Sequence, residues 1–141
     1  MDQRMSFITL GVRDLDAMKA FYNNVFGWIP LKDSDGIVFY KMNGFVLALY
    51  PSVELAEEVN TANDGNGFKQ FSMSINFKSE QEVDAIFNSL QQKGAKVVRS
   101  PEKVFWGGYR GYIADVEGNY WELAYNPFLE LDNSGNVKSH Q

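Results

Sequence analysis

The chain contains 141 residues, with 13 Lys and Arg against 18 Asp and Glu, so its formal net charge is −5. This length predicts a single domain, because globular domains average about 150 residues. The acidic balance argues against a nucleic-acid-binding protein, since contacts to phosphate require a face rich in Lys and Arg.

The residue types that are missing restrict the chemistry further. The sequence has no Cys, which excludes disulfides, a thiol nucleophile and iron–sulfur clusters. Its only histidine, His140, is the next-to-last residue, where chains are usually disordered. We therefore expect no Ser-His-Asp triad, no histidine-rich metal site and no histidine general base.

Apolar residues are numerous but never form a long run. No stretch approaches the ~18 residues of a membrane span, and residues 1–6 lack the apolar core of a signal peptide. We expect a cytoplasmic protein with no membrane partner. Aromatic residues make up 15% of the chain, which favours a dense core and an apolar cavity.

The first half of the chain predicts a strand, a helix and three more strands. Residues 6–12 alternate apolar with smaller or polar side chains, as in a β-strand. Asp14 precedes apolar residues at helical spacing, and Gly27 ends that helix. Residues 28–31 predict a short edge strand and residues 33–36 a turn. Residues 37–41 and 45–50 predict a hairpin through Asn43-Gly44.

The second half predicts the same order of elements. Residues 70–76 alternate as a strand, and Ser79 with Glu82 forms a capping box before a helix that Gly94 ends. Further strands are expected at residues 95–99, 111–114 and 120–125, with a break at Ser100-Pro101. Both halves therefore predict a βαβββ module.

The two modules cover about residues 5–51 and 68–127, and a unit of ~60 residues is too small to cover both faces of its own sheet. We expect one α+β domain over residues 1–141, in which two βαβββ modules form a curved mixed sheet around a central trough, with the helices outside. Residues 52–67 link the modules and include a short helix at 53–60, and the tail at 128–141 is expected to fray.

Motifs in both halves resemble those of the vicinal oxygen chelate superfamily, which includes glyoxalase I, bleomycin-resistance proteins and extradiol dioxygenases. The resemblance covers about residues 6–127, and the subgroup that looks most similar is glyoxalase/bleomycin-resistance-like. The matching segments are Leu10-Gly11-Val12-Arg13-Asp14-Leu15, Phe21-Tyr22, Phe26-Gly27-Trp28, Leu47-Ala48-Leu49-Tyr50-Pro51, Phe105-Trp106-Gly107-Gly108-Tyr109-Arg110-Gly111-Tyr112, Asp115, Gly118 and Trp121-Glu122-Leu123-Ala124-Tyr125-Asn126-Pro127.

The resemblance implies a trough in which the family's enzymes hold a divalent metal ion, with one ligand from the first and last strands of each half. In this sequence the four positions are Phe7, Leu47 or Ala48 depending on register, Gln70 and Glu122. Two of them are hydrocarbon. A hard cation takes about six oxygens, and a catalytic zinc takes at least three protein ligands. We therefore expect no metal cofactor.

The alternation along the strands also predicts which side chains line the trough. Phe71, Met73 and Ile75 are expected to face the helix that follows them, which turns the polar residues between them inward. The resulting mixture of rings, hydroxyls, one amide and one carboxylate suits an amphipathic or aromatic ligand. The expected ligand-binding residues are Phe7, Thr9, Leu47, Gln70, Ser72, Trp106, Tyr109, Tyr120 and Glu122, with Gly11, Ser74 and Ala124 on the same face.

Two interpretations stay open for each charged or unusual feature of the trough. Glu122 is either a catalytic acid or base and ligand anchor, or a group bonded to Gln70 or a serine with no ligand role. Arg110 either pairs with a ligand carboxylate or is solvated or paired with Asp115. The rings of residues 105–109 either close over the trough or pack in a hairpin or a dimer interface.

These features favour a metal-independent protein that binds a small amphipathic or aromatic molecule. The alternative is a metal-dependent glyoxalase-like lyase or isomerase, or a dioxygenase. The shortage of His disfavours a dioxygenase, because non-haem iron is usually held by two His and one carboxylate. A third possibility is a protein that acts chiefly as a partner subunit. We expect a homodimer, as is frequent in the superfamily.

Overall fold

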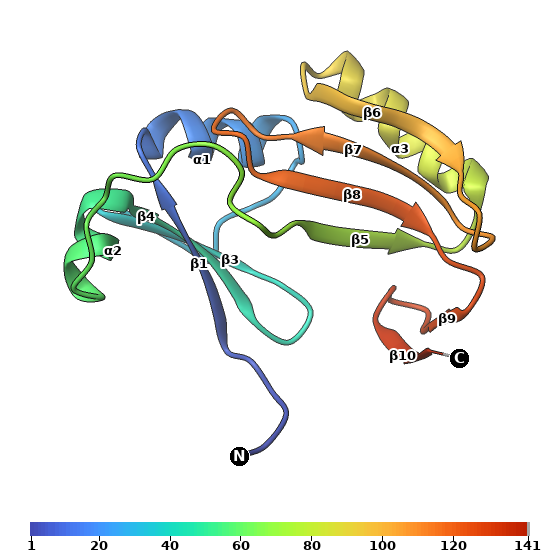
Figure 1. Cartoon of the computed structure of the whole chain (residues 1–141), viewed down its shortest axis with the longest axis horizontal. Helices are drawn as coiled ribbons and strands as arrows, with labels where there is room; N and C mark the ends of the chain where they lie inside the picture. Colours follow the sequence, from blue (N-terminus) through green and yellow to red (C-terminus); the bar gives the residue numbers. More distant parts are fainter. Residues whose placement is uncertain (141) are drawn as a thin grey trace. The chain divides into compact units, whose positions relative to one another are not determined.

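The computed structural model describes residues 1–140, and Figure 1 shows their secondary structure. The chain divides into two compact units, unit 1 from Met1 to Phe68 and unit 2 from Lys69 onward. Each unit contains a four-stranded mixed sheet with the same strand order and pairing directions. The predicted α+β class and the two βαβββ modules are confirmed, whereas the common trough stays a prediction.

Unit 1 orders its sheet β1-β4-β3-β2, with β1 parallel to β4 and the other pairs antiparallel. The Asp14 carboxylate caps α1 by accepting a hydrogen bond from the Ala17 amide at 3.0 Å. The elements are β1 (Phe7–Val12), α1 (Leu15–Asn24), β2 (Lys32–Ser34), β3 (Ile37–Lys41), β4 (Val46–Pro51) and α2 (Ser52–Glu58).

Aromatic rings concentrate in the core between α1 and the sheet of unit 1. Tyr22 stacks on Trp28 with ring centroids 5.5 Å apart, and Tyr40 lies 5.8 Å from Trp28. Each such pair contributes about 0.5–1.5 kcal/mol to stability beyond the free energy gained from the area that it buries. The predicted strand at residues 28–31 is wrong, because Trp28 turns into this ring cluster and the edge strand begins at Lys32.

Unit 2 orders its sheet β5-β8-β7-β6, with β5 parallel to β8. In the predicted capping box, Ser79 Oγ accepts from the Glu82 amide at 3.1 Å and the Glu82 carboxylate accepts from the Lys78 amide at 2.8 Å. The elements are β5 (Met73–Phe77), α3 (Glu80–Gln92), β6 (Lys96–Lys103), β7 (Tyr109–Ala114), β8 (Tyr120–Tyr125), β9 (Leu129–Leu131) and β10 (Val137–His140).

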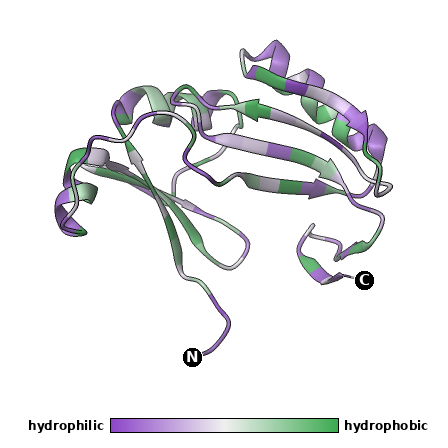
Figure 2. Cartoon of the chain, viewed as in Figure 1, coloured by the Kyte–Doolittle hydropathy of each residue, from purple (hydrophilic) through white to green (hydrophobic). Residues whose placement is uncertain are grey.

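The apolar stripe of α3 covers one face of this sheet (Figures 1 and 2). Val83, Phe87 and Leu90 are buried on the helix, and Trp121 and Leu123 are buried on the central strand β8. Each side chain of this size contributes about 1.5–3 kcal/mol when it leaves water. The sequence prediction that Trp121 and Leu123 face the helix agrees with their burial.

Strand β6 is longer than predicted. It continues through Ser100-Pro101 to Lys103, and its pairing with β7 shifts register on both sides of Arg99. An edge strand accommodates proline because the missing N–H can face away from the neighbouring strand, and bulges absorb the extra residues. The predicted break is therefore part of an irregular edge strand. Within it, the exposed residues Arg99 and Glu102 pair in register with Tyr112 and Arg110 of β7 and lie on the same face of the sheet as these partners.

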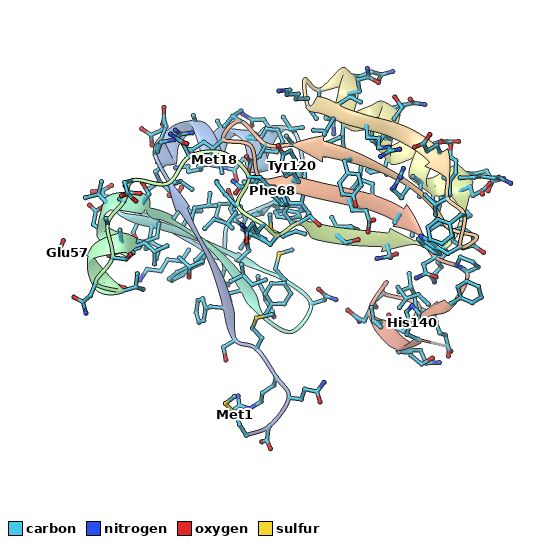
Figure 3. All side chains as sticks on the ribbon, in the orientation of Figure 1. Met1, Met18, Glu57, Phe68, Tyr120 and His140 are labelled. Atoms are coloured by element: carbon cyan, nitrogen blue, oxygen red, sulfur yellow. The ribbon has the colours of Figure 1, made fainter. Side chains whose placement is uncertain are left out.

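The prediction that the tail frays is wrong for residues 128–140, and Gln141 lies outside the described residues. Strands β9 and β10 form an antiparallel hairpin, which Figure 3 shows with His140 labelled on β10. Asp132 accepts hydrogen bonds from the amides of Ser134 and Asn136, both at 2.8 Å, and Glu130 pairs with Lys138. Local hydrogen bonds therefore order this segment.

No helix among residues 1–140 combines the length and the apolar character that crossing a lipid bilayer requires.

Candidate functional site

The two faces of the unit 2 sheet differ in chemistry. A Cβ placed on Gly111 would lie 2.8 Å from the Phe87 ring of α3, so the face that contains Gly111 and its register partner Leu123 is the helix side. Neighbouring residues along a strand point to opposite faces, so Arg110 and Tyr112 point away from α3. We call the side away from α3 the polar face; its members are Ser74, Asn76, Arg99, Glu102, Arg110, Tyr112, Tyr120, Glu122 and Ala124.

Glu122 is the central carboxylate of the polar face. Ser74 Oγ donates to Glu122 Oε1 at 2.8 Å, and Tyr112 Oη donates to Glu122 Oε2 at 3.1 Å. Both donors are neutral and both come from adjacent strands in register with Glu122. A carboxylate has about four acceptor positions, so roughly two remain for a ligand.

The hydroxyl donors are themselves held by neighbours. Asn76 Nδ2 donates to Ser74 Oγ at 3.2 Å, which orients the serine hydroxyl toward Glu122. Burial raises the pKa of the Tyr112 phenol, and the charge of Glu122 raises it further, so the phenol remains a donor at neutral pH. The arrangement places one carboxylate, with spare acceptor capacity, on a rigid sheet.

Two guanidinium groups lie on the same face of the sheet as Glu122, and both contact a second carboxylate, that of Glu102. Arg99 donates to Glu102 Oε1 through Nε at 2.8 Å and approaches it through Nη2 at 2.7 Å. Arg110 donates to the same oxygen through Nη1 at a longer 3.3 Å, and its guanidinium carbon lies 5.8 Å from the centre of the Tyr112 ring. Hydrogen bonds from Arg99 and then from Arg110 lower the pKa of the Glu102 carboxyl.

The side of the unit 1 sheet away from α1, here the far face, is mostly hydrocarbon. Phe7, half-exposed at 51%, packs edge-on against Phe39 with centroids 5.7 Å apart. Thr9 is the exposed hydroxyl in the same region and pairs in register with Ala48. Helix α2 covers the end of this face, since a Cβ on Gly11 would lie 3.2 Å from the Leu55 side chain.

The expectation that Leu47 lines the ligand face is wrong. Leu47 pairs in register with Tyr40, whose hydroxyl donates to Asn23 of α1 at 2.8 Å, so both residues are on the α1 side. Leu47 is only 1% exposed and belongs to the core. The other register considered for this strand, with Ala48 on the far face, is the one that the structure contains.

Gln70 and Ser72 lie outside strand β5, contrary to the prediction that the strand starts at residue 70. Gln70 has a positive φ of 62°, which interrupts an extended backbone, and both residues are exposed before β5 begins at Met73. The partner of Glu122 on β5 is therefore Ser74. Glu122 therefore has the serine partner that the second interpretation named, and among residues 1–140 it has no hydrogen bond to Gln70, while its role toward a ligand stays a prediction.

Tyr109 also differs from its predicted role. It lies on the helix side of β7, and its hydroxyl donates to Asp84 of α3 at 2.6 Å. This hydrogen bond raises the pKa of Tyr109 to about 12. Tyr120, in contrast, is half-buried at the start of β8 on the same face as Glu122, as predicted.

The loop between β6 and β7 carries two exposed rings. Phe105 is fully exposed, and Trp106, 39% exposed, lies against the α-carbon of Gly108, where a Cβ would meet the indole at 2.0 Å. The glycine therefore makes room for the ring. Whether these rings cover a ligand stays a prediction.

The donor set does not fit the divalent metal site that the resemblance implies. Of the four positions that the resemblance implies, Phe7, Ala48, Gln70 and Glu122, only Glu122 supplies a charged oxygen, and Gln70 lies before β5. Within each unit, the described residues contain no group of three or more His, Cys, Asp or Glu arranged to hold a metal ion. Zinc at an open site needs three protein ligands, and hard cations need more.

Sequence reasoning missed four members of the polar face. Asn76 and Tyr112 were identifiable from the alternation of side chains along a strand. Asn76 is two residues after Ser74, which was predicted to face inward, and Tyr112 is two residues after Arg110. Arg99 and Glu102 carried no such signal, since the register shifts of β6 place them. Arg110 pairs with Glu102 and not with Asp115, the partner named in one of the interpretations left open, and Asp115 accepts hydrogen bonds from Asn119 and the Glu117 amide in its own turn.

Known proteins share both the sequence pattern and the fold. The family profile of the Glyoxalase/Bleomycin resistance protein/Dioxygenase superfamily matches residues 4–123. A crystal structure of a glyoxalase-related enzyme from Fulvimarina pelagi is 36% identical, with a TM-score of 0.86 and 99% of each chain covered. A family enzyme from Burkholderia phytofirmans is 20% identical with a TM-score of 0.75, covering 86% of this chain and 98% of its own, a likeness of fold alone.

One curated relative is a lactoylglutathione lyase, GLX1 of Arabidopsis thaliana, which is 30% identical over 130 residues. The match covers 86% of this chain but 44% of the plant protein, so the chain spans less than half the length of that relative.

Proposed function

This chain belongs to the glyoxalase/bleomycin resistance protein/dioxygenase superfamily, and we propose that within it the chain binds a small amphipathic or aromatic molecule without a metal ion. The observation that carries this proposal is the state of Glu122. Its two oxygens accept hydrogen bonds from neutral hydroxyls of Ser74 and Tyr112, an arrangement that leaves acceptor positions for a ligand donor. The side chains around Glu122 in unit 2 do not include the three or more anionic or imidazole ligands that a divalent ion requires.

The surroundings of Glu122 support an organic ligand. Tyr112 and Tyr120 offer ring surface next to the carboxylate, and Asn76 and Ser74 offer hydrogen-bonding groups. Apolar surface with a few fixed polar groups is the usual composition of a small-molecule site. Glu122 would anchor a hydroxyl, amide or ammonium group of the ligand.

The test is a thermal-stability screen of the full chain with planar aromatic and amphipathic compounds, each with and without a chelator. A ligand at a hundredfold excess over its Kd should add about 2.7 kcal/mol to the free energy of unfolding, and the chelator should not change it. Glu122→Gln should weaken a ligand that donates to the carboxylate. Glu57→Gln, an exposed acid on α2, is the matched control and should leave binding unchanged.

Metal analysis of protein purified without chelators tests the metal independence that we propose. One tightly held divalent ion per chain, lost on Glu122→Gln, would overturn metal independence. It would favour the second candidate, a metal-dependent glyoxalase-like lyase, for which the 30% identity to the plant lactoylglutathione lyase is the supporting observation. Turnover of a 2-oxoaldehyde–thiol adduct would then identify the reaction.

We also propose that the protein acts as a homodimer in the cytoplasm. Large exposed aromatic side chains, among them Phe105 and Phe128, support an interface between two copies of the chain, because aromatic residues are enriched where proteins associate. Light scattering after size-exclusion chromatography should give twice the 16.0 kDa chain mass, and a monomer would refute the dimer. Cell fractionation tests the location.

A further inference from the structure

The guanidinium of Arg110 is poorly neutralised for a group in its position. Its side chain is only 14% exposed, yet its hydrogen bonding among residues 1–140 is limited to the 3.3 Å contact from Nη1 to Glu102 Oε1. A guanidinium group has five N–H donors, so most of those of Arg110 have no acceptor in the part of the chain that the structure describes. Arg99 already occupies the same glutamate oxygen at 2.7 and 2.8 Å.

The charges of this cluster do not cancel. Arg99 and Arg110 contribute +2 and Glu102 contributes −1, which leaves +1 at the β6–β7 side of the polar face. On the neighbouring strand, Glu122 contributes −1, and its hydrogen-bond partners within residues 1–140 are the neutral hydroxyls of Ser74 and Tyr112. Adjacent strands lie about 4.8 Å apart, so the positive and negative groups are within reach of one small molecule.

The Tyr112 ring fixes the position of Arg110. The guanidinium carbon lies 5.8 Å from the ring centre, and this cation–π contact holds the planar group over the residue that also donates to Glu122. Within residues 1–140, Nη1 is the nitrogen of the Arg110 guanidinium that has a hydrogen bond, and an edge of two guanidinium N–H groups matches the two oxygens of a carboxylate. The register partner of Arg110 on β8 is Ala124, whose side chain is smaller than those of the other residues paired across the sheet at this level, Asn76 and Glu102.

We propose that Arg110 binds a carboxylate of the ligand and thereby selects the ligand class: an apolar carboxylic acid that also has a hydrogen-bond donor for Glu122, such as a hydroxy acid. This inference rests on the proposed small-molecule function and specifies its ligand. Glu102 is then the competitor that the ligand carboxylate replaces at Arg110.

The experiment measures binding of mandelate, an aromatic hydroxy acid, to the full chain by calorimetry, alongside its methyl ester and phenylacetate. Mandelate should bind at least about tenfold more tightly than its ester, because a charge-assisted hydrogen bond is lost in the ester. Phenylacetate, which lacks the hydroxyl, should bind more weakly than mandelate, and Glu122→Gln should reduce that difference.

Variants of the cluster identify the residue responsible. Arg110→Gln should reduce the affinity for mandelate to that for the ester. Arg110→Lys should restore part of the preference for the acid over the ester, because lysine returns the positive charge without the planar pair of N–H donors. Glu102→Gln should tighten mandelate binding by removing the competing carboxylate. Lys103→Gln is the matched control, because it removes a cation from the same strand whose ammonium pairs with Glu80 of α3. Near-ultraviolet circular dichroism checks that each variant folds.

Two results would overturn the inference and leave the proposed function standing: the ester binds as tightly as the acid, or Arg110→Gln keeps the preference for the acid. A different result, in which no acid, ester or neutral compound of the stability screen binds, contradicts the proposed function itself and this inference with it.

Discussion

Replacing Gly111 of β7 with alanine tests whether the irregular edge strand β6 packs closely against β7. A Cβ at this position would lie 2.9 Å from both the Arg99 carbonyl oxygen and the Pro101 nitrogen, and 2.8 Å from the Phe87 ring. Two of these three neighbours are backbone atoms, which cannot turn away as the end of a side chain can. The bulged segment of β6 must therefore shift by several tenths of an ångström.

Overpacking of this kind costs about 1–3 kcal/mol, and the hydrogen bonds strained by the shift add to it, so we expect Gly111→Ala to lower stability by about 2–3 kcal/mol. For a chain of this size the Tm should fall by about 7–10 °C. Urea unfolding should show a lower midpoint with an unchanged slope.

Gly36→Ala is the control for this variant, because a Cβ there meets nothing within 4 Å. Its stability should stay within about 0.5 kcal/mol of the parent. If Gly111→Ala unfolds at the same urea concentration as Gly36→Ala, β6 is not packed against β7 as described, and the placement of Arg99 on the polar face loses its basis.

Three further predictions follow from other contacts. Gly108→Ala should displace the Trp106 ring and shift tryptophan fluorescence while costing less stability than Gly111→Ala, because the 2.0 Å conflict is with a partly exposed side chain; an unchanged spectrum would contradict this packing. The pKa of Tyr109 is raised to about 12 by Asp84, so its contribution to stability is present below pH ~10 and lost as pH rises through about 12; Tyr109→Phe should reduce the alkaline loss in urea titrations, and an unchanged pH dependence would refute the coupling. Asp132→Ala should raise amide hydrogen exchange throughout residues 129–140 and leave β5 to β8 protected, whereas protection equal to the parent would show that the turn does not hold the hairpin.

Among the described residues of unit 2, the groups bonded to the Glu122 carboxylate on the polar face are hydroxyls. Ser74, Tyr112 and Glu122 form a neutral-donor network around one charge, and Arg110 adds an opposite charge beside it. An arrangement with both signs and little neutralisation is suited to orienting a polar organic molecule. The binding and metal experiments above decide between that role and catalysis.

Local sequence signals predicted most elements correctly, because each of those signals acts within one or two turns of the chain. Asp14, Ser79 and Glu82 form the expected caps, and alternation on β8 placed Trp121 and Leu123 in the core. The C-terminal hairpin also had a local signal that our prediction did not use. Asp132 and Asn136 repeat the spacing of Asp115 and Asn119, with glycine before each asparagine, and both turns have the same hydrogen bonds.

The composition of the candidate site depended on tertiary structure. Whether Leu47 or Ala48 faces the α1 core is set by a one-residue register, and only pairing with Tyr40 decides it. The partner of Glu122 is Ser74 because β5 begins after the left-handed Gln70, and Arg99 reaches the polar face because bulges shift β6. Periodicity assigns residues to one face or the other, but which side chains become neighbours across strands is fixed by backbone pairing between segments far apart in the chain.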